Sequence, residues 1–253
     1  MSFVLVRYVL TAAVRDRLVL SLLVLMGLAV ALSVFMGSSA VIERDQFTAV
    51  YTAGSVRMIN ALALVLFVVF FVRRSFDSRD VEFMLSRPVS RIAFILSYAG
   101  GFSLMALFFG LVSGVCLYGV SPNLNYTGVV YWTVSLMMEN MVMVNTAFFF
   151  SMVLTSSATG AFATFGFYVL ARMMSQILGI IDSGKHFLHT QVLQTIMQIV
   201  SVFMPRLDLM AQTSWLLYGP DASVNLAFVL GQGAVYTALI VLAALVDLRF
   251  RQF

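Results

Sequence analysis

Glu139 and Arg172 are the side chains best placed to do chemistry, because each is a charged residue inside a long uncharged stretch of the chain. A charge alone at the centre of a bilayer costs at least about 2.5–3.5 kcal/mol on insertion scales, and a paired charge costs far less. The turn between the two stretches is expected near residues 155–156, and both residues lie equally far from it along the chain. Antiparallel helices would therefore hold them at the same depth, and we predict an ion pair that faces protein.

Such a pair has two interpretations. It can lock two helices together, or it can line a substrate path or a conformational gate. Asn140 and Asn145 lie close enough along the chain to join it. Since removal of either charge leaves the other unpaired, we expect Gln at Glu139 or at Arg172 to lower thermal stability about equally.

The sequence holds no motif for catalysis or for a bound metal. It lacks HExxH, GxSxG and CxxC, and its single cysteine, Cys116, lies in an apolar run. The stretch Gly179–His186 resembles a phosphate-binding loop, but it has His186 where Ser or Thr must bind magnesium, and it follows an apolar run rather than a core strand. His186 and His189 alone make a poor metal site. We expect no catalytic site, no metal and no cofactor in this chain.

The composition is that of an integral membrane protein. Of the 253 residues, 61% are hydrophobic and only 10% are charged, whereas a soluble domain carries roughly 25% charged residues. No break in composition divides the chain, so we expect a single domain over residues 1–253. The net charge of +4 comes mostly from arginines at the ends of apolar runs, which is typical of the positive-inside bias and not of nucleic-acid binding.

Uncharged runs separated by polar turns predict an all-α fold with six transmembrane helices. An N-terminal interfacial helix over 2–17 precedes them, with a basic stripe of Arg7, Thr11 and Arg15; the alternative is a frayed start of the first span. Arg57 lies near the outer end of the second span and can reach the headgroups. The expected spans are about 18–37, 55–72, 92–119, 128–154, 158–181 and 222–246.

The segment 73–91 is charged and lies between two uncharged runs. Most Lys and Arg residues fall in this segment and near the two chain ends, so we expect both termini and this segment on the cytoplasmic side of a cell inner membrane. Apolar and charged residues recur at helical spacing before Pro88, which predicts a short docking helix for a soluble partner; the alternative is a solvated loop. The expected docking residues are Phe76, Arg79, Asp80, Glu82, Phe83, Met84 and Arg87.

The segment 182–221 combines apolar residues with an uncharged polar stripe. This pattern predicts interfacial or re-entrant helices on the outer side, between the fifth and sixth spans. The expected outer contact residues are Gln191, Gln194, Gln198, Arg206 and Asp208.

One short motif resembles a known family. Residues Glu82–Arg91 read as an acidic residue, the apolar triplet Phe83–Leu85 and then Ser-Arg-Pro-Val-Ser-Arg. Together with the expected layout of helices, this motif is similar to permease subunits of type-2 ATP-binding-cassette (ABC) exporters. The stretch Pro205–Asp208 is similar to one in the branch linked to multicopper-enzyme maturation and nitrous-oxide-reductase assembly.

The resemblance implies a division of labour between subunits. A separate cytosolic ATPase would bind ATP and magnesium, and this chain would form a dimer with a second permease copy or a homologue. Segment 73–91 would be the coupling helix, with Phe76, Phe83 and Met84 as apolar anchors. The charged residues Arg79, Asp80, Glu82 and Arg87 would set its register on the ATPase. The implied function is export across the membrane.

Two other functions stay open. The chain could transmit ATPase motion to a periplasmic partner through 182–221 without translocating a substrate. It could instead be a secondary carrier, but carriers need an ion-binding carboxylate near the midplane. Glu139 is the only candidate, and its expected partner Arg172 neutralises it.

Overall fold

The computed structural model describes residues 3–39, 43–78, 90–121, 124–183, 204–220 and 225–250. Every regular element within these ranges is helical. The elements are α1 (Phe3–Arg15), α2 (Leu18–Ser38), α3 (Arg44–Asp77), α5 (Arg91–Val120), α6 (Tyr126–Val153), α7 (Ser157–Arg172), α8 (Met174–Ser183), the 3₁₀ turn η1 (Leu207–Leu209), α10 (Ser214–Tyr218) and α11 (Leu226–Phe250).

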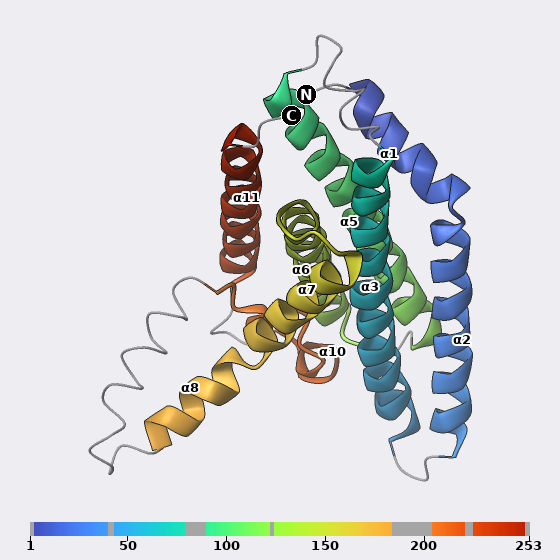
Figure 1. The fold of residues 1–253 in the computed structure, drawn as a ribbon. Coiled ribbons are helices and arrows are strands. Elements are labelled where there is room, and N and C mark those ends of the chain that lie inside the picture. Colours follow the sequence, from blue (N-terminus) through green and yellow to red (C-terminus); the bar gives the residue numbers. More distant parts are fainter. Residues whose placement is uncertain are drawn as a thin grey trace.

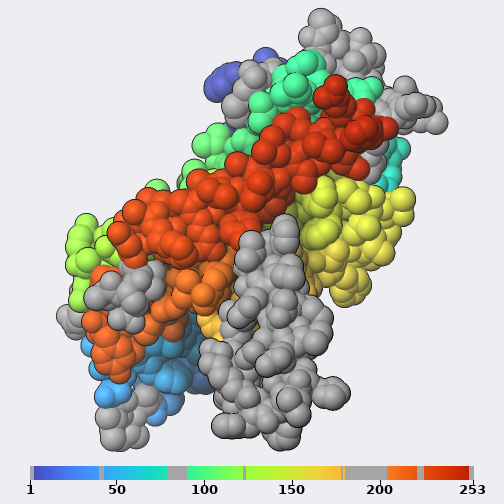
Figure 2. All heavy atoms as spheres, turned by 90° about the vertical axis from the view of Figure 1, so that its left-hand side faces the viewer, coloured from blue at the N-terminus to red at the C-terminus, as the bar shows by residue number. Residues whose placement is uncertain are grey.

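Helix α6 is the centre of the bundle. It packs against α3, α5, α7, α10 and α11, and 72% of its most apolar window is buried. Helices α2 and α11 lie at opposite sides of the bundle, and the two chain ends lie at the same end of the molecule (Figure 1). The outer face of α11, which is turned to the viewer in Figure 2, exposes large apolar side chains such as Leu239 and Leu242.

Five of these helices are long and apolar enough to cross a membrane, namely α2, α3, α5, α6 and α11. Their outward faces carry exposed Leu, Val and Phe side chains, as expected where lipid replaces water as the solvent. An all-α fold with several membrane-spanning helices therefore matches the sequence prediction.

Helix α3 is longer than the sequence predicts. The expected second span, 55–72, lies inside a helix of 34 residues, which is about 50 Å long and exceeds the roughly 30 Å hydrocarbon core. The first five residues of segment 73–91, Arg73–Asp77, form the C-terminal end of this helix. The expected docking helix, which includes Phe76, therefore begins within α3, and its remaining part over 79–89 lies outside the described residues.

The fifth expected span, 158–181, is two helices rather than one. Helix α7 ends at Arg172 and α8 begins at Met174, so the helix is interrupted at Met173, and α8 follows α7 in Figure 1. Neither glycine nor proline stands at the break. The cause is tertiary, since η1 packs against both α7 and α8.

Glycines let the helices approach closely at several contacts with α6. A Cβ atom on Gly110 or Gly114 of α5 would overlap Met137 or Thr133 of α6, and one on Gly128 of α6 would overlap the carbonyl oxygen of Trp215 in α10. Small residues commonly serve this purpose between membrane helices. Gly128 thus lets α10 lie directly on the first turn of α6.

We predict that Gly128→Ala lowers the free energy of unfolding by about 1–3 kcal/mol, because α10 must move away from α6 to admit a methyl group. The matched control is Gly166→Ala, since a Cβ atom on Gly166 of α7 meets nothing within 4 Å. Unfolding in mixtures of dodecyl maltoside and SDS measures both. Equal stability of the two variants would show that α10 does not press on α6.

Candidate functional site

The site is built around the middle of α6, where Glu139 is only 1% exposed. Arg172, the last residue of α7, lies beside it, with Arg172 Nη1 3.2 Å from Glu139 Oε2. The structure thus brings together the two charged residues that the sequence pairs by depth. Asn145 makes its contact elsewhere, because its side chain donates a hydrogen bond to Ser103 Oγ of α5 at 2.9 Å.

Tyr168 is a third member of the site that the sequence analysis missed. Its hydroxyl donates to Glu139 Oε1 at 2.9 Å, so each carboxylate oxygen has its own partner. Tyr168 precedes Arg172 by four residues, which places both on the same face of α7. That spacing is a signal that the sequence already contained.

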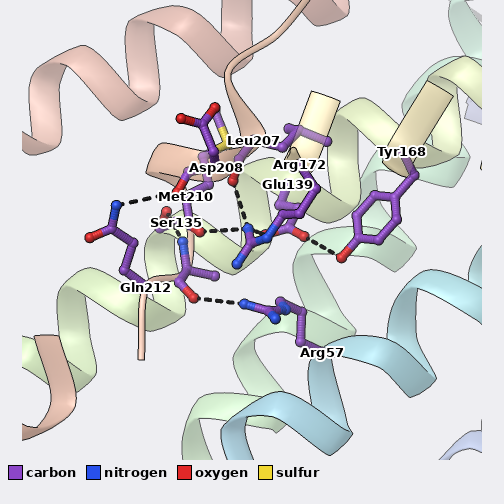
Figure 3. A network of polar contacts seen from close by, with 10 residues as sticks. Arg57, Ser135, Glu139, Tyr168, Arg172, Leu207, Asp208, Met210 and Gln212 are labelled. Carbon is purple, nitrogen blue, oxygen red and sulfur yellow. Dashed lines mark hydrogen bonds and ion pairs between the residues drawn. The ribbon is translucent and has the colours of Figure 1, made fainter. Parts of the chain in front are cut away.

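Arg172 also binds the backbone of residues 204–220, which we call the return segment. Its Nη1 donates to the carbonyl oxygens of Leu207 at 2.6 Å and Met210 at 2.8 Å. Leu207 and Met210 are fully buried, and non-helical backbone inside a membrane bundle must find its hydrogen bonds within the protein. Arg172 therefore serves the return segment as well as Glu139 (Figure 3).

Arg57 of α3 binds the same segment, and the expectation that it reaches the headgroups is wrong. Its Nη1 donates to the carbonyl oxygen of Ala211 at 3.1 Å. Ala211 is buried with φ +47°, a conformation that is uncommon for residues other than glycine. Ser135 of α6 accepts a hydrogen bond from the Ala211 N–H at 2.8 Å. Side chains from α3 and α6 thus hold both backbone groups of the strained residue.

Apolar contacts seat the return segment in the same place. Ala211 and Leu216 belong to a buried cluster with Ala53 of α3 and Trp132 of α6. Trp215 is 1% exposed, and its ring meets that of Tyr131 edge to face. The segment is therefore packed into the bundle and is not a surface loop.

Arg206 and Asp208, expected as outer contact residues, bind each other. Arg206 Nη2 lies 3.0 Å from Asp208 Oδ2 and donates to Ser175 Oγ of α8 at 2.9 Å. The Ser175 hydroxyl also hydrogen-bonds to Asp208. These contacts fasten the start of the return segment to α8, just beyond the break at Met173.

The other expected site residues are only partly covered by the structure. Phe76 lies in the last turns of α3 and packs, partly buried, against the main core. Two further sets lie outside the described residues, namely the docking residues Arg79, Asp80, Glu82, Phe83, Met84 and Arg87, and the outer contact residues Gln191, Gln194 and Gln198.

The arrangement is suited to fastening helices rather than to bond chemistry. Each carboxylate oxygen of Glu139 has a hydrogen-bond partner, and Arg172 Nη1 contacts that carboxylate and two backbone carbonyl oxygens, so both charged groups are engaged in contacts between elements. Among the described ranges, no group of three His, Cys, Asp or Glu side chains is placed to hold a metal ion. The network joins α3, α6 and α7 to the return segment (Figure 3).

We predict that Arg172→Gln destabilises the protein more than Glu139→Gln, which corrects the expectation of equal effects. The first change leaves the buried Glu139 carboxylate without its cation and removes the donor to the Met210 carbonyl oxygen, at a cost of about 3–5 kcal/mol. The second leaves Arg172 its carbonyl partners, at a cost of about 1–2 kcal/mol. Detergent unfolding measures both free energies.

The control for this pair is Arg7→Gln, which removes an exposed arginine of α1 and should change stability by less than about 0.5 kcal/mol. The double variant with Glu139→Gln and Arg172→Gln should be more stable than Arg172→Gln alone, because no buried charge remains. If Glu139→Gln lowered the free energy of unfolding more than Arg172→Gln does, the carbonyl contacts of Arg172 would not contribute to stability.

Comparison of the chain with models of known protein families and with curated proteins finds no match. The case for a function therefore rests on the residues and their geometry.

Proposed function

We propose that this chain is the membrane permease subunit of an ABC exporter, in which a separate cytosolic ATPase drives movement of the membrane helices. The proposal combines the motif at Glu82–Arg91 with the position of the two helices that flank segment 79–89. The end of α3 and the start of α5 lie toward the end of the molecule that holds both termini (Figure 1). In the proposed topology this end is cytoplasmic in a cell inner membrane, because it collects most of the arginines.

The observation that carries the proposal is the tethering of both flanks of 79–89. On one flank, Arg74 Nη1 at the end of α3 lies 3.4 Å from Asp16 Oδ2 in the turn between α1 and α2. On the other, Arg91 Nη1 at the start of α5 donates to the carbonyl oxygen of Leu248 near the end of α11 at 3.0 Å. A force applied to 79–89 would thus reach α1, α2 and α11 as well as α3 and α5.

A third tether leads toward the centre of the bundle. Arg73 Nη1 donates to the carbonyl oxygen of Leu154 at 3.2 Å, in the turn between α6 and α7. Helix α3 runs from there to Arg57, which holds Ala211 in the return segment. A displacement of the α3 end therefore has a continuous path of helix and hydrogen bonds to the return segment.

In this mechanism ATP and magnesium stay on the partner ATPase, and the chain contributes no hydrolytic residue. Closure of the ATPase subunits would push 79–89, and the helices would move as a tethered group. The chain would act as a dimer with a second permease. A non-translocating role remains the second candidate, because the same path ends at the return segment, which is part of the segment 182–221 expected to contact a periplasmic protein.

We predict that Phe83→Asp combined with Met84→Asp uncouples the permease from its ATPase. The double change would replace the two apolar side chains that the proposed docking contact depends on with carboxylates. The tagged chain is purified in mild detergent, co-purified soluble proteins are identified by mass spectrometry, and ATP hydrolysis is measured after reconstitution in liposomes. The wild type should retain an ATPase, and the double variant should lose it by tenfold or more.

The control adds the same two charges at a distance from that segment, with Tyr126→Asp and Tyr218→Asp, which replace side chains 71% and 84% exposed. This variant should keep the ATPase. Retention of the ATPase by the Phe83/Met84 variant would contradict the docking role. Substrate-dependent stimulation of hydrolysis supports export, whereas co-purification of a periplasmic protein without such stimulation supports the non-translocating role.

A further inference from the structure

A cavity of about 240 Å³ lies between α1 and the last turns of α3. Its wall includes Thr11, Arg15 and Asp16 from the α1 side and Phe71 and Arg74 from α3. This region belongs to the end of the molecule where both chain termini lie (Figure 1). The cavity is separate from the network around Glu139.

The charges of the cavity leave one positive charge unbalanced. Arg74 is paired with Asp16 at 3.4 Å. Arg15 is exposed and has no hydrogen bond or ion pair with any part of the chain that the structure describes. Two guanidinium groups and one carboxylate thus give a net charge of +1, which one monoanion would neutralise.

The cavity lies at the depth where the chain changes from uncharged to charged. Helix α2 begins at Leu18 and carries no charge, and α3 carries none from Met58 to Val72. Apolar side chains close to the cavity along the chain face outward, with Val14 66%, Leu20 61% and Phe70 52% exposed. A ligand here would have its charged part in the cavity and apolar surface next to it.

We propose that this cavity binds the headgroup phosphate of an anionic phospholipid. A phosphodiester carries one negative charge, and guanidinium groups bind phosphate oxygens with paired N–H donors. Arg15 and Arg74 approach the phosphate from α1 and α3, and the Thr11 hydroxyl supplies a further donor. The acyl chains lie against the exposed apolar side chains of the neighbouring helices.

Such a lipid would join α1 to α3 beside the tether between Arg74 and Asp16. Its binding would hold the end of α3 more firmly against α1. In the proposed function, this end of α3 receives the force that the ATPase applies to segment 79–89. The site itself does not depend on an ATPase partner, because it uses only residues of this chain and the membrane.

The test is lipid retention by the whole protein. Protein purified in detergent is titrated with phosphatidylglycerol or phosphatidylcholine, and bound lipid is counted by native mass spectrometry. We expect phosphatidylglycerol to bind at one saturable site and phosphatidylcholine to bind more weakly. Arg15→Gln should weaken phosphatidylglycerol binding about fivefold, and its combination with Arg74→Gln about 30-fold, because each arginine near a membrane surface contributes a comparable share.

Asp16→Asn gives an effect of opposite sign. Removal of the carboxylate raises the net charge of the cavity to +2 and frees Arg74, so phosphatidylglycerol should bind about fivefold more tightly. Loss of a merely structural ion pair would not raise lipid affinity. Arg249→Gln is the control, since it removes an exposed arginine at the end of α11, outside the cavity, and should leave binding unchanged.

Several results would overturn the proposal. Equal retention of the two lipids would show that charge does not select the ligand. Displacement of phosphatidylglycerol by 10 mM inorganic phosphate would assign the cavity to a soluble phosphate instead of a lipid. Unchanged phosphatidylglycerol binding in Arg15→Gln would also overturn the proposal. Because this variant keeps the ion pair between Arg74 and Asp16, a loss of lipid binding in it would not be explained by misfolding.

Discussion

This structure depends on one constraint. Wherever a helix ends or breaks inside an apolar bundle, its backbone carbonyl groups need a hydrogen-bond donor. Water is absent from the hydrocarbon region, so an unpaired carbonyl there costs several kcal/mol. Within the return segment, Arg57 donates to the carbonyl oxygen of Ala211, and Arg172 donates to those of Leu207 and Met210. Arginines make contacts of the same kind at the end that carries the termini, where Arg73 binds Leu154 and Arg91 binds Leu248.

These contacts connect neighbouring elements at the places where a helix ends or breaks, and we call each such contact a joint. Each arginine lies on one helix and binds a backbone group on another element, so two elements that share no helical hydrogen bonds move together. Arg91 and Arg73 make joints at the end that carries the termini, and Arg57 and Arg172 make them around the return segment. In the proposed function, a displacement of the end of α3 would pass along this helix to Arg57 and its contact with Ala211.

The sequence was sufficient for the helical class and for the pairing of Glu139 with Arg172, because length, hydropathy and distance from a turn are local or additive properties. It was not sufficient for the break at Met173 or for the contact of Arg57 with Ala211. Neither position carries a glycine or proline signal, and both depend on where the return segment packs. The spacing of four between Ser135 and Glu139, and between Tyr168 and Arg172, did hold usable information about that face.

The geometry also gives the two members of the charged pair different structural roles. A pair that only locked two helices would need one contact, yet Arg172 Nη1 reaches two carbonyl oxygens in addition to the carboxylate. The arginine is thus the structural agent that holds the return segment. Glu139 is the buried counter-charge of this arginine, and the Tyr168 hydroxyl fixes the orientation of its carboxylate.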